Sequence, residues 1–521
     1  MLALLYLTGP VASDDVLYLE IARDPTPPAD PAQMSHGYGR VGFWLLLGLS
    51  RSLFGESWIT FLPVPLLSAA GTLWLTARLA RRWMNGRAAA ASALFLGLLP
   101  LFIVYSTISL PDITAAFVTM AALSLLAPPL LNRDHRRSTV QCLLGGFVVG
   151  AGFSVKESVI FLCPSLALFV LLTWPRCAWA WRRLFLIAVG AALGLSAEMA
   201  VLWYTTGNPL YHFESIRVSQ ENAGTPVADN TWRTILFHST EYVRMLATGR
   251  DLFGAWGPLY LAAAGYALVR GTHWARLLLC CLFVVGSYLS VGTSDLKHYF
   301  PLYHQARYLI PLAPPAVLLT VHLIVDVLSH RPRLRKMGIV ALAAIAAHSM
   351  WLPNGAAGNA YLAGTFRAAE LLFAEPFAAA DPSSGIVASS QSTKRIWLTA
   401  AQAGAGSPEI VTDPSPGTSD AWTARYGGRC VWVTALDRDR DRQRRGGVLT
   451  FDSQAALQEF ELVVSAAPPR NRLNAVFAWL GLVDPLFDAR QRIDVYRIPM
   501  PDAATPTGQF KRTIAPATGC Q

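Results

Sequence analysis

The sequence predicts an α-helical, polytopic membrane protein that ends in a small α/β domain. The chain has 521 residues, of which 53% are hydrophobic and only 15% charged, whereas soluble globular chains carry roughly 25% charged residues. Long apolar runs alternate with short basic segments. This composition excludes a soluble enzyme, a disordered protein, a collagen and a nucleic-acid-binding module, so we expect no nucleic-acid partner.

The apolar runs define the expected membrane part, residues 1–352. A spanning helix needs about 20 mostly apolar residues. Spans are expected near 58–80, 88–106, 113–131, 139–155, 158–174, 184–204, 253–270, 276–292, 309–328 and 338–352. Met1–Thr8 is apolar but too short to cross a bilayer, so we expect it to be the outer end of a first, truncated span. The expected number of spans is therefore about eleven.

Basic residues gather in alternate loops of this membrane part. These loops hold 16 of its 26 Lys and Arg residues, and the positive-inside rule assigns such loops to the cytoplasm. We therefore expect a multi-pass protein of the plasma (inner) membrane. Its outward-facing segments are then the first outer loop 10–57, the loops 107–112, 205–250 and 293–308, and the chain after Trp351.

Residues 353–521 differ in composition from the rest of the chain. They hold 17 basic and 16 acidic residues, and Gly, Pro and Ser separate short strand-like runs. These runs are Gly385–Ser390, Cys430–Leu436, Phe460–Ser465 and Arg492–Ile498, and helix-like stretches at 363–379 and 453–462 alternate with them. The segment predicts one soluble, extracytoplasmic α/β domain, in which Cys430 and Cys520 could pair or stay free.

The first outer loop carries two adjacent carboxylates, Asp14 and Asp15, at the expected membrane surface. Ser13 could cap a helix that begins there, and acidic residues are favourable in a first turn. Tyr18 lies one turn after Asp14, on the same face. Taken alone, the pattern fits either a capped interfacial helix or the start of a catalytic site.

Further motifs follow in a fixed order on the expected outer side. They are an outer-loop helix over Val41–Phe54, Ser109-Leu110-Pro111-Asp112, Gly150-x-Gly152-x-x-x-Lys156, Gly207-Asn208-Pro209-Leu210-Tyr211 and Arg307-Tyr308-x-x-Pro311. Together with Asp14-Asp15-x-x-Tyr18, this series resembles the GT-C glycosyltransferases, in the branch of the protein O-mannosyltransferases and the lipid A aminoarabinose transferases. Asp15 stands where Glu is common in that family.

The resemblance implies a GT-C fold and an enzyme that moves a hexose or pentose from a polyprenyl-phosphate carrier to an acceptor hydroxyl with inversion. Such chemistry needs a base, cations for the departing phosphate and an apolar groove for the lipid tail. The implied catalytic residues are Asp14 as base, Asp15 as its partner and Asp112 as an orienting group. Without the resemblance, Asp112 also fits a simple helix-start residue after Pro111.

Candidate substrate-binding residues lie at the outer ends of spans. Lys156 and Arg307 are the phosphate candidates, although each could instead snorkel to the interface and Lys156 could pair with Glu157. Further candidates are Lys297, His298 and Tyr308 around Arg307, and His36, Arg40 and Tyr18 in the first outer loop. Glu198 lies inside a span, which indicates function or a buried pair.

No cofactor is expected and no metal ligand set is predicted, with a divalent metal left open because His298 and His304 are near each other in sequence. The expected partners are the polyprenyl-phosphate sugar donor, membrane lipid, and an acceptor glycan, lipid or protein. The sequence names neither the sugar nor the acceptor. Two other functions stay open: a multi-pass secondary transporter, which usually shows internal repeats and acids at mid-membrane depth, and a polyprenyl-linked glycan ligase or polymerase.

Overall fold

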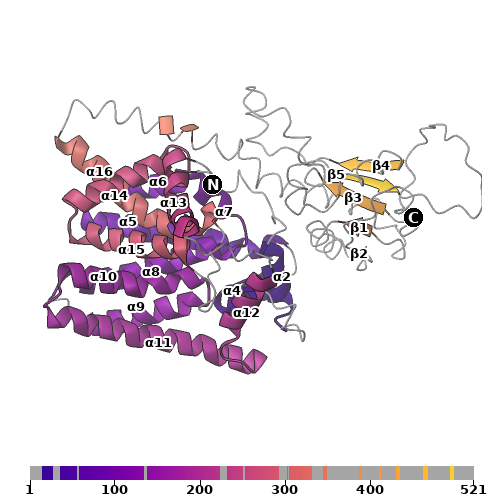
Figure 1. The fold of residues 1–521 in the computed structure, drawn as a ribbon, viewed down its shortest axis with the longest axis horizontal. Helices are drawn as coiled ribbons and strands as arrows, with labels where there is room; N and C mark the ends of the chain where they lie inside the picture. The colour runs from indigo at the N-terminus through magenta and orange to yellow at the C-terminus, as the bar shows by residue number, and fades with distance from the viewer. Residues whose placement is uncertain are drawn as a thin grey trace, which may run out of the picture. The chain divides into compact units, whose positions relative to one another are not determined.

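A computed structural model describes most of the helical part of the chain and the strands of its C-terminal part (Figure 1). The described residues are 14–26, 36–55, 58–133, 138–222, 232–249, 253–292, 302, 304–330, 344–345, 347–348, 386–388, 410–411, 430–434, 461–466 and 493–497. Contacts along the chain define a helical unit of Met1–Leu7, Leu17–Gly55 and Ile59–Pro353, and a second unit of Thr8–Val16, Glu56–Trp58 and Asn354–Gln521. Each unit is described by itself.

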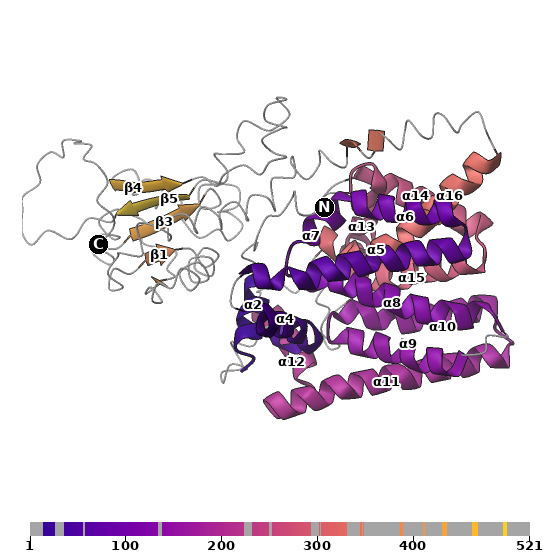
Figure 2. The ribbon, with the colours of Figure 1, turned by 180° about the vertical axis from the view of Figure 1, so that it is seen from behind.

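The helical unit consists of α-helices joined by short 3-10 helices. They are α2 (Asp14–Arg23), α3 (His36–Gly39), α4 (Val41–Phe54), η2 (Trp58–Phe61), α5 (Pro63–Trp83), α6 (Gly86–Leu98), α7 (Pro100–Tyr105), α8 (Pro111–Leu131), α9 (Ser138–Phe153), η3 (Glu157–Phe161), α10 (Leu162–Thr173), α11 (Ala178–Thr206), α12 (Tyr211–Asn222), α13 (Trp232–Thr248), α14 (Trp256–Arg270), α15 (His273–Val291), η4 (Ala306–Leu312) and α16 (Ala313–His330). Figure 2 shows α5, α6 and α8 on the reverse face of this unit.

Four described helical segments are long and apolar enough to cross a membrane: Pro111–Leu131, Ala178–Thr206, His273–Val291 and Ala306–Val327. Four further apolar helices are shorter, namely Val41–Phe54, Gly86–Leu98, Ser138–Phe153 and Glu157–Thr173. The protein is therefore a multi-pass membrane protein, as the sequence predicts. The total of eleven spans stays a prediction, because most of the run 338–352 and all of Met1–Thr8 lie outside the described residues.

The predicted continuous span at 88–106 is wrong in one respect, because the structure divides it into α6 and α7. Leu99 has an extended backbone, with φ −66° and ψ 118°, and Pro100 begins the next helix. Proline has no N–H to donate and disfavours a helical conformation in the residue before it. The break therefore follows from Pro100.

Arg183 in α11 binds the C-terminal end of the neighbouring helix α8. Its guanidinium is buried and donates to the carbonyl oxygens of Pro129, Asn132 and Arg133, at 2.9 Å to Asn132 and 2.5 Å to Arg133. The last carbonyls of a helix lack intrahelical partners. Arg183 satisfies one of them, that of Pro129, and also binds the two residues that follow α8, so it fixes the end of α8 against α11.

Among the described helices, α9 and α11 share the most extensive contact and run side by side (Figure 1). Glycines repeat at a spacing of four on both, as Gly146 and Gly150 on α9 and Gly190 and Gly194 on α11. A Cβ atom on Gly150 would overlap the backbone carbonyl oxygen of Ala191. Small residues at this spacing let two helix backbones touch, which is the usual way helices associate in lipid.

The second unit contains a five-stranded mixed sheet in the order β2-β1-β3-β5-β4. Its strands are β1 (Ile386–Ala388), β2 (Ile410–Val411), β3 (Cys430–Thr434), β4 (Glu461–Ala466) and β5 (Ile493–Arg497). β1 is parallel to β2 and β3, and β5 is antiparallel to β3 and β4. Val and Ile dominate these strands, in keeping with their preference for pleated, half-buried positions.

The four strand-like runs expected from the sequence coincide with β1, β3, β4 and β5, and β2 is an addition. The helix-like stretch 363–379 lies outside the described residues, as do Cys520 and most of 453–462. The last two residues of 453–462, Glu461 and Leu462, belong to β4 rather than to a helix. The boundary at 352/353 and the α/β class of this domain stay predictions.

Replacing Gly150 with Ala is expected to destabilise the α9–α11 pair by about 1–3 kcal/mol, because the added methyl group has no space against backbone atoms. Gly265→Ala in α14 is the matched control, since a Cβ there meets no atom within 4 Å. Thermal melting of both variants in the same detergent measures the effect. Equal melting temperatures for the two variants would contradict the close packing of α9 on α11.

Candidate active site

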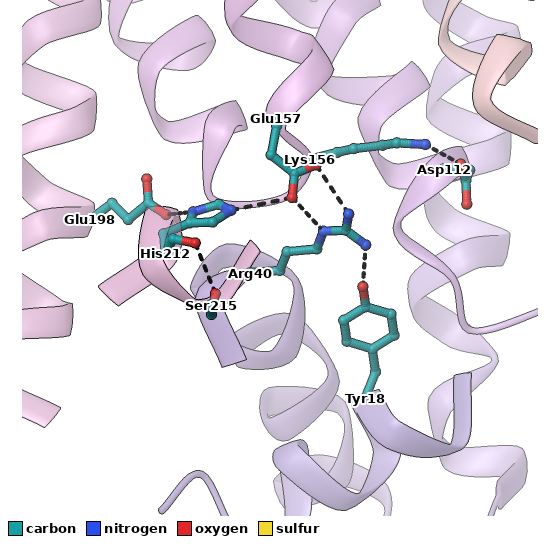
Figure 3. Close-up of polar contacts among 8 residues, drawn as sticks. All are labelled: Tyr18, Arg40, Asp112, Lys156, Glu157, Glu198, His212 and Ser215. Carbon is teal, nitrogen blue, oxygen red and sulfur yellow. Dashed lines mark hydrogen bonds and ion pairs between the residues drawn. The ribbon is translucent and has the colours of Figure 1, made fainter. Parts of the chain in front are cut away.

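A buried polar cluster forms where α2, α3, α8, α9, α11, α12 and η3 meet (Figure 3). Its described members come from positions far apart in the sequence. They are Tyr18, Arg40, Asp112, Lys156, Glu157, Glu198 and His212, with Arg307 and Tyr308 beside them. Six of the nine, not counting His212, carry a formal charge that is buried or nearly so.

Arg40 is held by two partners at the N-terminus of α4. Its Nε and Nη2 atoms each donate to one carboxylate oxygen of Glu157 at 3.0 Å. Its Nη1 donates to the phenol oxygen of Tyr18, which is fully buried. A two-pronged contact of this kind fixes the orientation of both groups. Because three donor nitrogens of Arg40 are occupied, Arg40 orients its neighbours rather than presenting an open fork to a ligand.

Lys156 and Glu157 are neighbours in sequence but take different partners. The backbone at Lys156 is extended, with φ −159° and ψ 133°, and successive side chains along extended backbone point to opposite sides. Lys156 therefore forms its ion pair with Asp112, on the first turn of α8. Its ammonium also lies 4.4 Å from the centre of the Tyr308 ring.

Arg307 approaches the same aromatic ring. Its guanidinium carbon lies 5.4 Å from the ring centre of Tyr308, and only 9% of the residue is exposed. Cations within about 6 Å of an aromatic ring are attracted to its face. Lys156 and Arg307 thus meet around Tyr308, which places two positive groups and the Asp112 carboxylate in one small volume.

His212 lies between two carboxylates. Its Nδ1 is 2.6 Å from an oxygen of Glu198 in α11, and its Nε2 is 3.3 Å from an oxygen of Glu157. The residue is 1% exposed. Glu198, an ionisable residue inside an expected span, is therefore part of a buried pair, which is one of the two outcomes its position indicates.

The pKa values of these groups follow from burial and from their partners. Burial alone would raise the pKa of Glu157, but Arg40 and His212 outweigh it and hold that pKa well below its usual value. Burial would lower the pKa of His212, yet its two carboxylate partners raise it. For Lys156, burial lowers the pKa despite the opposing effect of Asp112. Glu157 therefore stays ionised to lower pH than a free glutamate, and His212 keeps its imidazolium form to higher pH than a free histidine.

Several predicted site residues come together here, and others lie elsewhere. Tyr18, Arg40, Asp112, Lys156, Arg307 and Tyr308 all join the cluster or its border. His36 is at the edge, with its ring 6.5 Å from that of Tyr18. Asp14 and Asp15 are the first residues of α2, but their side chains lie outside the described residues, as do Lys297 and His298.

The sequence did not single out Glu157 or His212 as site residues. The sequence offered Glu157 only as a possible ion-pair partner of Lys156, but in the structure Lys156 pairs with Asp112. His212 follows the Gly207–Tyr211 motif and has no spacing that marks it. The one available signal was Glu198, because a carboxylate in a span requires a partner.

His304 pairs with a different histidine. Its ring stacks on that of His238, with centres 4.9 Å apart and Nδ1 atoms 3.2 Å apart. Within the described ranges, no group of three or more His, Cys, Asp or Glu side chains could hold a metal ion.

An apolar cavity of about 420 Å³ lies between α13, α14, α15, η4 and α16. Its walls are mostly Leu, Val, Ala and Phe side chains, and Tyr242, Ser290 and Leu309 form part of its lining. Tyr242 is close enough to Asp112, Arg307 and Tyr308 for their charges to affect its pKa, which burial raises. The cavity therefore adjoins the cationic side of the polar cluster.

Glu157→Gln is expected to reduce the stability of the fold by about 3–5 kcal/mol, because it leaves the Arg40 charge mostly buried without its counter-ion. Glu241→Gln is the matched control. It removes the partner of Arg244, a pair at the protein surface, and should change stability by less than about 0.5 kcal/mol. Thermal melting in detergent compares them, and a similar small effect for both would mean that the Arg40–Glu157 pair is not a structural tie.

The chain was compared with known families and structures. Residues 39–204 match the family model of the dolichyl-phosphate-mannose-protein mannosyltransferases. No curated protein matches the chain. Among solved structures, ArnT from Cupriavidus metallidurans in the apo state is 14% identical, with a TM-score of 0.55 and coverage of 92% of this chain and 95% of ArnT.

Two further structures are similar in fold. ArnT from Cupriavidus metallidurans bound to undecaprenyl phosphate is 13% identical, with a TM-score of 0.50 and coverage of 94% and 98%. The oligosaccharyltransferase of Archaeoglobus fulgidus, in complex with Zn and sulfate, is 12% identical, with a TM-score of 0.50 and coverage of 81% of this chain and 62% of that enzyme. With the family match at 39–204, this shared fold confirms the predicted resemblance to GT-C glycosyltransferases of the ArnT and protein mannosyltransferase type.

Proposed function

We propose that the protein is a membrane glycosyltransferase that moves a sugar from a polyprenyl-phosphate donor to an acceptor hydroxyl, with inversion at the anomeric carbon. The reaction takes place on the outer face of the plasma membrane, as the distribution of basic loops indicates. The acceptor is a glycan, a lipid or a protein hydroxyl. The sugar is a hexose or pentose.

The observation that carries this proposal is the pairing of two buried cations with an apolar cavity. Lys156 and Arg307 meet around Tyr308, and Leu309 beside them lines a cavity of about 420 Å³. A lipid phosphate has the same two-part character, an anionic head joined to an apolar tail. The volume falls within the roughly 300–1,000 Å³ typical of small-molecule sites, and the structure of ArnT with undecaprenyl phosphate supports a polyprenyl-phosphate ligand.

The chemistry divides between a base and the cations. The acceptor oxygen attacks the anomeric carbon, the bond from that carbon to the phosphate oxygen breaks, and the acceptor proton passes to a carboxylate. Asp14 is the proposed base. It begins α2, one helical turn before the buried Tyr18, and Asp15 follows as its partner.

The lipid phosphate leaves with an added negative charge. Positively charged groups fixed in a water-poor site stabilise such charge more than water does. Lys156 and Arg307 supply these charges, while Asp112 keeps Lys156 aimed toward Tyr308 and can orient the acceptor or sugar.

The two alternative functions have less support. A secondary transporter would place its ionisable residues on a path through the membrane, whereas the hydrogen bonds and ion pairs here join Tyr18 of α2, Arg40 at the start of α4 and His212 of α12, all in expected outer loops, to Glu157 and to each other. The match to a mannosyltransferase family over 39–204 favours transfer from a lipid-linked sugar. A glycan ligase or polymerase would share the polyprenyl donor, and the identity of the labelled product distinguishes it.

Asp14→Asn is expected to lower sugar transfer by about 10²–10⁴-fold, because an amide cannot accept the acceptor proton. The assay uses radiolabelled polyprenyl-phosphate sugars and an envelope extract as acceptor. Asp24→Asn is the matched control, since Asp24 is an exposed carboxylate just after α2 that accepts from the backbone N–H of Thr26. If a folded Asp14→Asn enzyme transfers sugar at the wild-type rate, Asp14 is not the base, and Asp15 and Asp112 become the candidates. If the wild-type enzyme transfers no sugar, the proposed function is wrong.

Arg307→Gln is expected to raise the KM for the lipid donor about tenfold or more, because a charge-assisted contact to phosphate contributes about 1.5–3 kcal/mol. The variant should also weaken inhibition by free undecaprenyl phosphate. Arg217→Gln, an exposed cation on α12, is the control and should leave both values unchanged. An unaltered KM and unaltered inhibition in Arg307→Gln would remove Arg307 from the phosphate site.

A further inference from the structure

Five side chains form one continuous line of hydrogen bonds and ion pairs from α11 to α2 (Figure 3). We call this line, Glu198–His212–Glu157–Arg40–Tyr18, the polar chain. Each member belongs to a different part of the fold: α11, α12, η3, the N-terminus of α4, and α2. The chain therefore links five segments that are distant in sequence.

We propose that His212 is a positioning residue: it holds Glu157, and through Glu157 and Arg40 it fixes the segment Leu17–Arg23 of α2, which continues from Asp14 and Asp15. This inference rests on the proposed function for its effect on catalysis, and on the structure alone for its effect on α2. His212 does not touch substrate in this proposal, because only 1% of it is exposed and carboxylates bind both ring nitrogens.

His212 is held by packing contacts as well as by its two carboxylate partners. Phe153 lies against it with ring centres 4.7 Å apart, and Ser215 donates to its backbone carbonyl oxygen at 2.8 Å. Gly39, the residue before Arg40, packs directly on the ring, since a Cβ there would lie 2.7 Å from Cδ2 of His212. The backbone that carries Arg40 is thus seated on His212 as well as tied to it through Glu157.

Tyr18, at the other end of the polar chain, fixes the position of α2. Tyr18 is fully buried, accepts from Arg40, and packs edge-on against Phe43 with ring centres 5.0 Å apart. Asp14 is one turn earlier on the same helix. A displacement of Arg40 would therefore move or loosen the turn of α2 that begins with the proposed base.

The charge state of His212 controls the chain. The charged groups that face the ring are Glu198 from α11 and Glu157 from η3, with Arg40 behind Glu157. With both carboxylates ionised, each ring nitrogen donates a hydrogen bond, which requires the imidazolium form. Loss of that proton as the pH rises leaves one carboxylate without a donor. The polar chain is therefore intact below the pKa of His212 and weakens at alkaline pH.

His212→Gln tests the proposal, with His322→Gln as the matched control. His322 lies in α16 against Tyr266 and Trp274, away from the polar chain. In His212→Gln we expect kcat for sugar transfer to fall about 10- to 100-fold, with the KM for the lipid donor unchanged. We expect the alkaline decline of the wild-type kcat to disappear in this variant and to persist in His322→Gln.

Glu198→Gln is the second variant, in case His212→Gln folds poorly. It retains the histidine but removes one negative charge beside it, so the alkaline decline of kcat should move to lower pH by about one unit. A structural role unrelated to the charge of His212 would leave that pH profile where it is in the wild type.

Hydrogen exchange of the backbone amides of Leu17–Arg23 gives a readout that does not depend on activity. Exchange should become about tenfold faster or more in His212→Gln and stay at the wild-type rate in His322→Gln. Unchanged exchange in His212→Gln, or a wild-type kcat and pH profile in that variant, would overturn the positioning role. If the wild type transfers no sugar, the proposed function fails, while the exchange experiment still decides whether His212 fixes α2.

Discussion

The ion pair between Arg40 and Glu157 is the contact on which the arrangement of α2, α3, α12 and η3 depends. The two residues are 117 positions apart in sequence and mostly removed from water. Separating a buried pair is costly, because each charge then lacks the solvation that its partner replaces. The backbone around both residues must therefore come together, and this brings α2, α3, α12 and η3 to one place.

The same constraint divides the cations of the site into two roles. Arg40 donates to Glu157 and Tyr18 within the protein, so it stabilises the arrangement of the helices around it. Lys156 and Arg307 instead lie around the Tyr308 ring, beside the apolar cavity. A site with charge at one end and an apolar space at the other suits a ligand with a phosphate head and a hydrocarbon tail.

The helices below this region provide a rigid frame for it. Glycines bring α9 and α11 into backbone contact, and Arg183 fixes the end of α8 against α11. Lys156 and Glu157 follow directly after α9, while Glu198 is on α11 and Asp112 on α8. The close packing of these three helices therefore sets the positions of four charged side chains, even though those glycines and Arg183 have no part in the proposed chemistry.

The sequence by itself determined the class of protein and most helix positions, because apolar length and loop charge are local properties of the chain. The order of its motifs also gave the candidates Tyr18, Arg40, Asp112, Lys156, Arg307 and Tyr308. The sequence also determined four of the five strands, since alternating β-branched runs are local too. Only the tertiary structure decided which charges pair. Lys156 lies next to Glu157 in sequence but pairs with Asp112, 44 positions away, and His212 carries no pattern at all. Ion pairing depends on burial and on which helices touch, and neither is visible in the order of residues along one segment.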